Sequence, residues 1–415
     1  QAARAAAGCD PADWELEREL GLLGLGEEFL DRRFGSLSPG EQTRVLLAAL
    51  FLQQGCYPLI DEPTNHLDAE GRARLGRYLR GQRRGFLLVS HDRALLNDCV
   101  DHILSLERSG PMLLAGSYDD WQREADRRDA RELAENDRLA GEISRLQAGV
   151  RRTAAWSDQV EKSKFNTRNS GLRVDRGYVG HQSAKMMKRA KAIEARQQKA
   201  IAEKSALLKD LETAEPLKLH PLQHPAACLV RCRDLTVQYG GRPVFAGAGF
   251  ELHAGDRLAL TGPNGCGKSS LLRLVCGQAV PHTGLCQTAS GLVISYLPQT
   301  PEDCPGTAAD YADGYALDKS LFFAILRKLG FERVQFEKPV AGLSAGQRKK
   351  LMLARSLCQP AHLYVWDEPL NYIDVLSRRQ VEQLILQYRP TLLFVEHDRA
   401  FCRAVATRTL PLGGA

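Results

Sequence analysis

The chain of 415 residues lacks any long apolar segment. Its longest uninterrupted apolar run, Val45–Leu52, is far shorter than the roughly 18 residues that a membrane span requires. We therefore expect neither a membrane span nor a secretory signal peptide. A composition of 44% hydrophobic and 26% charged residues is typical of a globular protein, here of the cytoplasm, with two or three domains.

Paired cysteine spacing is absent as well. The eleven cysteines are odd in number and scattered, and none forms a CxxC pair. The nearest two, Cys228 and Cys232, lack the second pair or the histidine cluster that would complete a structural metal site. The sequence therefore predicts free thiols in a reducing compartment.

Excess charge of one sign is confined to one segment. The formal net charge is +6, but residues 151–204 contain fourteen Lys or Arg against five Asp or Glu. That segment has a net charge of +9, which leaves the rest of the chain at −3. The basic character thus belongs to one element of the chain.

Three motifs recur 306 residues apart in one register without a gap. The pairs are Leu37 and Leu343 at the start of LSPGEQ and LSAGQ, Asp61 and Asp367 at the start of Asp-Glu-Pro, and His91 and His397. This agreement indicates an internal repeat. A glycine-rich loop at Gly262–Ser269 precedes only the second copy, so we expect the chain to begin inside its first repeat.

Short apolar runs alternate with helical stretches in both copies, which predicts α/β repeats built on a parallel sheet that is covered on both faces. The predicted strands are Tyr57–Ile60, Phe86–Val89, Leu363–Trp366 and Leu392–Val395. We predict three domains: a partial first repeat at 1–118, a helical linker at 119–220 and a complete second repeat at 228–415.

The predicted linker contains two stretches, 119–155 and 181–213, whose apolar residues recur at spacings of three and four. The two stripes are Leu139, Ile143, Leu146 and Val150, and Met186, Ala190, Ile193, Ala200, Leu207 and Leu211. This pattern predicts an antiparallel helical hairpin packed as a coiled coil. Each arm would be roughly 50 Å long, with a tip at Trp156–Gly180 that mixes cations with aromatic rings.

The glycine-rich loop has the full GxxxxGKS pattern and follows an apolar strand, Arg257–Leu260. In such a loop backbone N–H groups surround the phosphates, Lys268 neutralises their charge, and the Ser269 hydroxyl ligates Mg²⁺. The predicted nucleotide-binding residues are Gly262, Pro263, Asn264, Gly265, Cys266, Gly267, Lys268, Ser269 and Ser270. The loop therefore predicts ATP or GTP binding.

Asp367 and Glu368 end a predicted strand, which places both carboxylates at the same sheet edge as the loop. We predict that Asp367 holds Mg²⁺ and that Glu368 is the general base. Alone, such a pair is often only a helix N-cap. His397 follows the next strand and is placed to contact the γ-phosphate or the water. A lone histidine is usually structural, but the repeat of His397 at His91 favours a functional role.

Together these motifs resemble those of the ATP-binding cassette ATPases. Two cassettes joined by a charged hairpin, with the phrase DEPTNHLD from Asp61, are similar to the ABC-F subfamily. The resemblance implies that Gln299 is the Q-loop residue and binds Mg²⁺, that LS-x-G is the signature, and that Tyr239 stacks on adenine. By residue type alone, Tyr239 is nearly as consistent with a core tyrosine, and LS-x-G with a plain helix N-cap.

The resemblance further implies that two cassettes close intramolecularly on ATP, each site lying between the loop of one and the signature of the other. Here one site would be complete, with Lys268, Ser269, Gln299, Asp367, Glu368 and His397 facing Ser38, Gly40 and Glu41. In the other, Asp61 as the metal residue and Glu62 and His91 as catalytic residues face Ser344, Gly346 and Gln347. No phosphate-binding lysine precedes them. Pro39 and Ala345 replace the usual second glycine.

By this resemblance the chain is an ATPase that acts on the ribosome, either in antibiotic resistance by ribosome protection or as a translation factor. Its basic hairpin, 151–204, would contact 23S rRNA and tRNA near the exit site, consistent with cations and rings that suit RNA. The alternatives are the ATPase subunit of an ABC transporter, and a chain that binds nucleotide without turnover.

Overall fold

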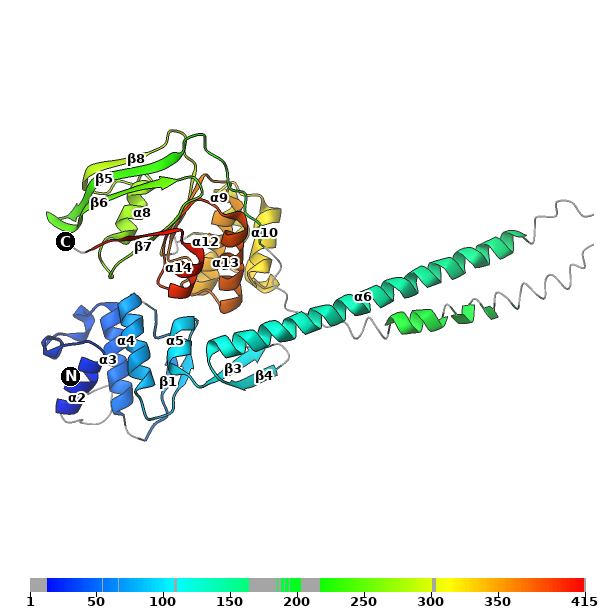
Figure 1. Ribbon diagram of the computed structural model, residues 1–415, viewed down its shortest axis with the longest axis horizontal. Coiled ribbons are helices and arrows are strands. Elements are labelled where there is room, and N and C mark those ends of the chain that lie inside the picture. Colours follow the sequence, from blue (N-terminus) through cyan, green and yellow to red (C-terminus); the bar gives the residue numbers. More distant parts are fainter. Residues whose placement is uncertain are drawn as a thin grey trace, which may run out of the picture. The chain divides into compact units, whose positions relative to one another are not determined.

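The computed structural model describes residues 13–53, 55–65, 67–107, 110–163, 185, 188–189, 191–193, 195–202, 217–300 and 304–413. Two compact units are distinguished: Asp120–Thr213 forms one, and Gln1–Asp119 with Ala214–Ala415 forms the other (Figure 1). Each unit is described by itself below. The three domains, 1–118, 119–220 and 228–415, stay a prediction.

A five-stranded parallel sheet with strand order β12-β7-β11-β10-β9 forms the centre of the second repeat. Its strands are β7 (Arg257–Thr261), β9 (Ile294–Leu297), β10 (Leu363–Asp367), β11 (Leu392–Val395) and β12 (Arg408–Pro411). Successive side chains of a strand point to opposite faces. Accordingly, Leu393 and Val395 pack in one core cluster, and Leu392 and Phe394 pack in another. The predicted parallel sheet with two covered faces is therefore confirmed for this repeat.

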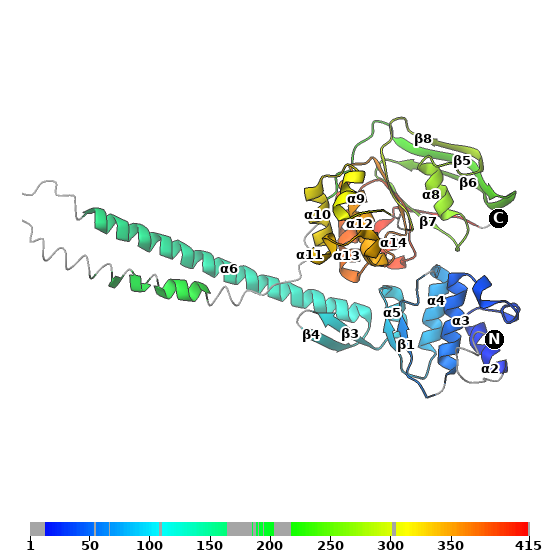
Figure 2. The ribbon, with the colours of Figure 1, turned by 180° about the vertical axis from the view of Figure 1, so that it is seen from behind.

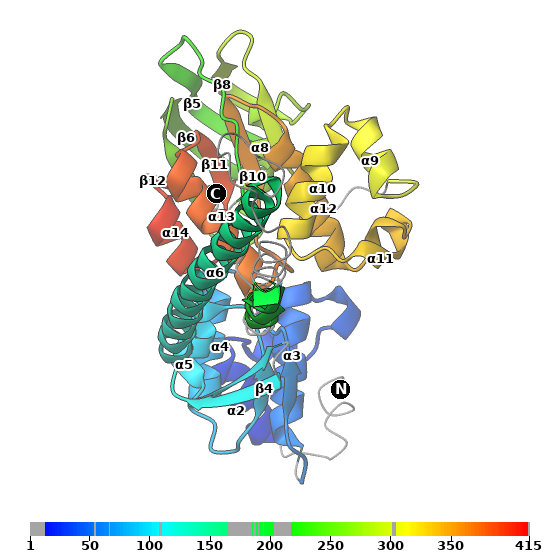
Figure 3. The same cartoon turned by 90° about the vertical axis from the view of Figure 1, so that its right-hand side faces the viewer.

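An antiparallel sheet, β6-β5-β8, packs over one face through α8, and helices cover the other. Figure 2 shows this sheet and helices α9 to α13 on opposite sides of the repeat, and Figure 3 shows α9, α10 and α11 together at one edge. The elements are β5 (Cys228–Tyr239), β6 (Arg242–His253), α8 (Lys268–Val275), β8 (His282–Thr288), α9 (Ala308–Gly314), α10 (Lys319–Lys328), α11 (Arg333–Phe336), η3 (Val340–Gly342), α12 (Ala345–Cys358), α13 (Val375–Tyr388) and α14 (Arg399–Val405).

The first repeat has a smaller sheet in the residues that the structure describes. Its elements are α2 (Asp13–Leu22), η1 (Glu27–Phe29), η2 (Phe34–Ser36), α3 (Pro39–Leu52), β1 (Leu59–Asp61), α4 (Ala69–Arg80), β2 (Leu87–Val89), α5 (Arg93–Cys99), β3 (His102–Glu107) and β4 (Gly110–Ala115). Strands β1 and β2 pair in parallel, as predicted. However, Leu59, Leu87 and Val89 are 68%, 48% and 52% exposed. Coverage of both faces is therefore wrong here, because only the α-helical side has a core.

The linker unit contains one long helix, α6 (Tyr118–Ser163), of 46 residues, which is about 69 Å long and exceeds the predicted arm. The prediction that the tip begins at Trp156 is wrong, because the backbone stays helical to Ser163. The second arm is helical where it is described, and Gly149 approaches Gln197. Ile193 is 47% exposed, so its predicted packing is wrong. Met186, Ala190, Leu207 and Leu211, and tip residues 164–180, lie outside the described residues.

Long apolar helices and disulfide bonds are both absent from the part of the chain that the structure describes. None of the helices there has both the length and the apolar character that a membrane span needs. The ten cysteines that lie in the described ranges are all free thiols, as predicted.

The two parallel sheets differ in how well their backbone hydrogen bonds are shielded from water. Because β1 and β2 expose large apolar side chains whereas β10 and β11 are buried throughout, we expect their amides to exchange at different rates. Hydrogen exchange followed by mass spectrometry should show β1–β2 exchanging at least about tenfold faster than β10–β11. Equal protection would contradict this stability difference.

Candidate functional site

The loop between β7 and α8 can be built only with glycine at its two ends. Gly267 is the N-cap of α8 with φ 88°, and a Cβ there would lie 2.8 Å from the ring of Phe245. Gly262 has φ 148°, and a Cβ there would collide with the carbonyl oxygen of Leu412. The left-handed backbone and the close approach of neighbours exclude other residues. The loop thus turns sharply into a helix N-terminus, which favours anion binding.

Lys268 lies inside this loop and is only 7% exposed. Its Nζ donates to the carbonyl oxygens of Gly262 and Pro263, both at 2.8 Å. These bonds hold the ammonium group within the turn where the loop would surround a phosphate. Tyr239 is 46% exposed and its hydroxyl lies 3.0 Å from Ser270 Oγ. The alternative that Tyr239 is a core tyrosine is therefore wrong.

Asp367 ends β10 and is 1% exposed, next to the loop. Burial raises the pKa of Asp367, and a hydrogen bond with the Ser269 hydroxyl opposes this shift. Its Oδ1 has no hydrogen-bond partner although it is buried. An orphaned carboxylate oxygen beside a hydroxyl matches the hard oxygen ligands that Mg²⁺ prefers. The residues present therefore fit a Mg²⁺ ion.

Glu368 follows in the left-handed region with φ 48°, and its N–H still donates to Val395 O at 3.0 Å. Its Oε1 lies 3.3 Å from His397 Nε2, and its Oε2 accepts a hydrogen bond from Asn371 Nδ2. Burial alone would raise the pKa of Glu368, but hydrogen bonds from His397 and Gln299 and the nearby charges lower it to about 2. Glu368 is therefore an ionised, buried carboxylate.

Lys349 on α12 is a residue that sequence reasoning missed. It is fully buried, and its Nζ donates to the carbonyl oxygens of Pro298, Gln299 and Asp367 at 3.0, 3.2 and 3.1 Å. Burial lowers the pKa of Lys349 to about 8 against the attraction of the carboxylates around it. The side chain ties the Gln299 segment to the end of β10. The available signal was its spacing from the apolar Met352 and Leu353, which places it on the buried face of α12.

Glu396 was also missed. Its buried carboxylate accepts hydrogen bonds from the backbone N–H groups of Leu370, His397 and Asp398, at 3.1, 2.7 and 3.3 Å. It therefore fixes the loop that carries His397 against the residues that follow Glu368. A carboxylate at a strand end before His-Asp was the signal in the sequence, but its backbone partners depend on the tertiary fold.

Both LS-x-G segments begin helices with capping boxes. Ser38 Oγ accepts from Glu41 N, and Ser38 N donates to Glu41 Oε2 at 2.7 Å. In the second repeat the amide oxygen of Gln347 takes the role of that carboxylate and accepts from Ser344 N at 3.0 Å. In both copies the serine therefore acts as a helix N-cap, as the alternative interpretation of LS-x-G predicts. Contact of Ser38, Gly40, Glu41, Ser344, Gly346 and Gln347 with nucleotide stays a prediction.

Glu62 in the first repeat has the same backbone as Glu368 but different electrostatics. Its φ is 44°, and its N–H donates to Val89 O at 2.8 Å. His91 Nε2 is 3.6 Å from Glu62 Oε1, a buried oxygen without a hydrogen-bond partner. Burial raises the pKa of Glu62 to about 7, and it lowers the pKa of His91. The predicted metal residue Asp61 is exposed, unlike Asp367.

Residues of the two repeats meet within their shared compact unit. The backbone N–H of Asn264, in the phosphate-type loop, donates to Asp68 Oδ2 at 3.4 Å. Arg378 on α13 donates to the carbonyl oxygen of His91 at 2.9 Å. These contacts bring the loop of the second repeat to the segment that follows Asp61 in the first.

Removing the charge of Glu62 and removing that of Glu368 should change the free energy of unfolding in opposite directions. The unfolded pKa of glutamate is 4.5, and the folded pKa of Glu62 is about 7, so ionised Glu62 lowers stability above pH 7 and has no such effect below about pH 4.5. We expect Glu62→Gln to raise the free energy of unfolding by up to about 3 kcal/mol at pH 8 and hardly at all at pH 4.

For Glu368 the folded pKa is about 2, so its stabilisation is present above pH 4.5 and is lost as the pH falls towards 2. Glu368→Gln should therefore lower the free energy of unfolding at pH 8 by up to about 3 kcal/mol. Urea denaturation of both variants measures these changes. Shifts of the same sign at pH 8 would contradict the assignment.

Lys349→Met should leave three buried carbonyl oxygens without a donor. We expect the free energy of unfolding to fall by about 3 kcal/mol. Lys319→Met is the matched control, because Lys319 pairs with Asp313 on the surface and its loss should cost less than about 1 kcal/mol. Urea denaturation measures the free energy of unfolding of both variants. Equal decreases would show that the buried contacts of Lys349 stabilise the fold no more than a surface ion pair does.

Comparison with known proteins agrees with this geometry. A sequence family described as "ABC transporter" matches residues 245–371. The chain is 28% identical to the Ribosome protection protein VmlR of Bacillus subtilis (strain 168), over 89% of the chain and 67% of that protein. It is 29% identical to the Putative ATP-binding protein YdiF of the same organism, over 95% of the chain and 58% of the relative.

A third relative is the Energy-dependent translational throttle protein EttA of Haemophilus influenzae (strain ATCC 51907 / DSM 11121 / KW20 / Rd), with 28% identity over 97% of the chain and 67% of the relative. The chain thus spans 58 to 67% of the length of these relatives. Among solved structures, the archaeal ribosome recycling factor aABCE1, in complex with stalk protein aP1, has a TM-score of 0.62 and 21% identity. That match covers 99% of the chain and 68% of the solved chain, and it shows the shared fold of tandem cassettes. With two nucleotide-binding cassette repeats joined by a helical linker, the chain resembles the ABC-F group of ATP-binding cassette proteins.

Proposed function

We propose that the chain hydrolyses ATP to ADP and phosphate at the site of the second repeat. The observation that carries this proposal is Glu368, an ionised carboxylate held 3.3 Å from His397 at the sheet edge where the phosphate-binding loop begins. In this role Glu368 orients and polarises the attacking water, and His397 contacts the γ-phosphate. Lys268 neutralises phosphate charge from within the loop.

Asp367, Ser269 and Gln299 would hold Mg²⁺. The ion, when bound, neutralises charge on the β- and γ-phosphates. The support from this chain is the buried, unpartnered Oδ1 of Asp367 and the hydrogen bond between Asp367 and the Ser269 hydroxyl. Lys349 holds the backbone of both Gln299 and Asp367, so it would keep these two ligands in register. Asp61, which is exposed, is the weaker metal candidate of the first repeat.

We further propose that the active site is shared, with Ser38, Gly40 and Glu41 of the first repeat closing over ATP bound to the second. The hydrogen bond from Asn264 N to Asp68 Oδ2 supports this arrangement. The helix N-terminus that begins at Ser38 would offer N–H groups to the γ-phosphate. In the second site Glu62 and His91 would face Ser344, Gly346 and Gln347.

The partner that we propose for this ATPase is the ribosome, with ATP-bound cassettes placing the basic segment 151–204 against 23S rRNA and tRNA near the exit site. Two relatives carry names that refer to ribosome protection and to translation. The local net charge of +9 suits a polyanionic surface. Antibiotic resistance by ribosome protection and translation-factor activity are the two outcomes that we propose.

A transporter ATPase is the second candidate, since the matching family is described as "ABC transporter". It is disfavoured by the long helix α6 and the basic segment between the repeats, which have no obvious role in a transporter ATPase. Capture of an integral membrane protein by the purified chain, in place of ribosomes, would favour it.

The test uses Glu368→Gln, which keeps the shape of the side chain but removes its charge. ATP turnover should fall at least about 100-fold, and the variant should co-sediment with ribosomes in the presence of ATP. Lys268→Ala should abolish both turnover and ATP-dependent co-sedimentation. Glu337→Gln, on an exposed glutamate of the same repeat, is the matched control and should behave as the wild type.

The two parts of the proposal fail separately. Turnover that survives in Glu368→Gln would contradict its assignment as the general base. If Glu368→Gln loses turnover as expected but does not co-sediment with ribosomes in the presence of ATP, the ATPase assignment stands. The ribosome is then contradicted as the partner.

A further inference from the structure

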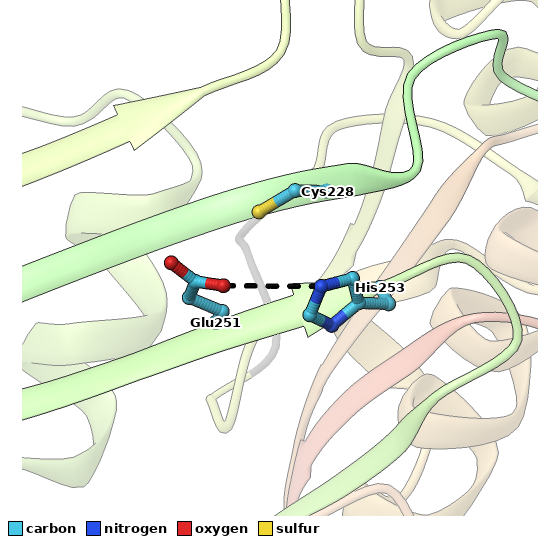
Figure 4. Close-up of side chains that lie close together, drawn as sticks. All are labelled: Cys228, Glu251 and His253. Carbon is cyan, nitrogen blue, oxygen red and sulfur yellow. Dashed lines mark ion pairs between the residues drawn. The ribbon is translucent and has the colours of Figure 1, made fainter.

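We propose that the antiparallel sheet of the second repeat carries a Zn²⁺ site formed by Cys228, Glu251 and His253. Among the residues that the structure describes, these are the one group of three metal-binding side chains whose ligand atoms all lie within 4.8 Å of one another. Figure 4 shows the three side chains converging from strands β5 and β6, with the ion pair between Glu251 and His253 drawn. Neither the nucleotide site nor the proposed ribosome contact uses them.

A β-bulge brings the thiol to this place. Glu251 and His253 are two residues apart on β6 and share a face of the sheet. Across the hairpin, Arg231 pairs with Glu251 and Cys228 pairs with His253. Because Cys228 and Arg231 are three residues apart, a regular strand would place their side chains on opposite faces. The register shift between Cys228 and Val230 adds the extra residue that turns Cys228 onto the same face as His253.

The donor set matches Zn²⁺ chemically. Thiolate, imidazole and carboxylate are the three ligand types of protein zinc sites, with bonds of about 2.3, 2.0 and 2.0 Å. Two tetrahedral bonds of about 2.0 Å put a nitrogen and an oxygen ligand about 3.3 Å apart, and His253 Nε2 and Glu251 Oε2 lie 3.8 Å apart. Cys228 and Glu251 are partly buried and His253 is exposed, so small side-chain rotations can close the set, and a water completes the fourth position.

A second carboxylate is placed to orient the histidine. Asp256 Oδ2 lies 3.6 Å from His253 Nδ1, the ring nitrogen on the other side from Glu251. The same oxygen accepts from the backbone N–H of His253 at 3.0 Å and from Arg408 Nη1 at 3.3 Å. A carboxylate at the non-ligating nitrogen is the usual second partner of zinc-bound histidines, because it fixes the tautomer that leaves Nε2 free for the metal.

The two arginines near the site are the competing interaction. Arg231 Nε donates to Glu251 Oε1 at 2.8 Å, and Arg233 lies 4.0 Å from the same oxygen. Both use Oε1, and Oε2 is the oxygen that faces His253. An arginine–glutamate ion pair accounts for Glu251 alone, but it does not account for a cysteine and a histidine on the same face beside it.

The experiment titrates the full chain with Zn²⁺ against a chromophoric chelator, and with Co²⁺ followed by absorption. We expect one high-affinity Zn²⁺ per chain, release of the Cys228 thiol proton on binding, and a thiolate-to-cobalt charge-transfer band. Cys228→Ser should remove the band and weaken Zn²⁺ binding at least tenfold, whereas Cys304→Ser, a thiol elsewhere in the same repeat, should change neither. Asp256→Asn should weaken binding about 10- to 100-fold.

Arg231→Gln separates metal binding from damage to the fold. Removing a cation that competes for Glu251 should tighten Zn²⁺ binding several-fold, a gain that partial unfolding cannot produce. The site is overturned if the Co²⁺ complex has no thiolate band, if Cys228→Ser binds Zn²⁺ as the wild type does, or if Arg231→Gln binds it more weakly while its circular dichroism is unchanged.

Discussion

The candidate ATP site depends on one constraint, which is that Glu368 must carry a negative charge in a place where burial opposes it. A buried carboxylate left alone becomes protonated. His397, Gln299 and Lys349 all favour the ionised form of Glu368. Each comes from a different element, so the charge persists only if the segments after β9, β10 and β11 and the start of α12 are held together.

The backbone around Glu368 shows how this assembly is fixed. Its positive φ is an unfavourable conformation for a residue with a side chain, yet its N–H stays in the ladder with Val395. Glu396 and Lys349 then bind the neighbouring backbone on either side. Several buried polar contacts thus hold the backbone around Glu368, and such contacts are what keep a strained residue in place.

The first repeat shows that this backbone does not by itself produce the same chemistry. Glu62 repeats the positive φ and the ladder bond of Glu368, but its Oε1 has no hydrogen-bond partner and its pKa is raised to about 7. The position that corresponds to Lys349, 306 residues earlier, is Thr43, which offers no ammonium group. The same turn thus holds an anion in the second repeat and, in the first, a carboxyl group whose pKa burial raises to about 7.

Sequence reasoning identified the parallel strands and the loop because apolar runs and a glycine pattern are local signals, and the register of 306 residues showed that the motifs repeat. It missed Lys349, because a lysine on a helix is expected to be solvated, and its three carbonyl partners come from residues distant in sequence. It also missed the cluster at Cys228, since His253 reaches it only across a hairpin and through a bulge. The exposed face of β1–β2 was missed as well, because an apolar strand does not reveal what covers it.

The low pKa of Glu368 has a consequence for the proposed reaction. A carboxylate with a pKa of about 2 is a weak proton acceptor, since general bases work best with a pKa near the operating pH. The largest single cause that opposes burial is His397, which the proposed mechanism assigns to the γ-phosphate. If His397 contacts the γ-phosphate as proposed, Glu368 loses that partner while burial still raises its pKa. Nucleotide binding would thereby convert Glu368 from the anion of an ion pair into a stronger base at the moment when the water is in place.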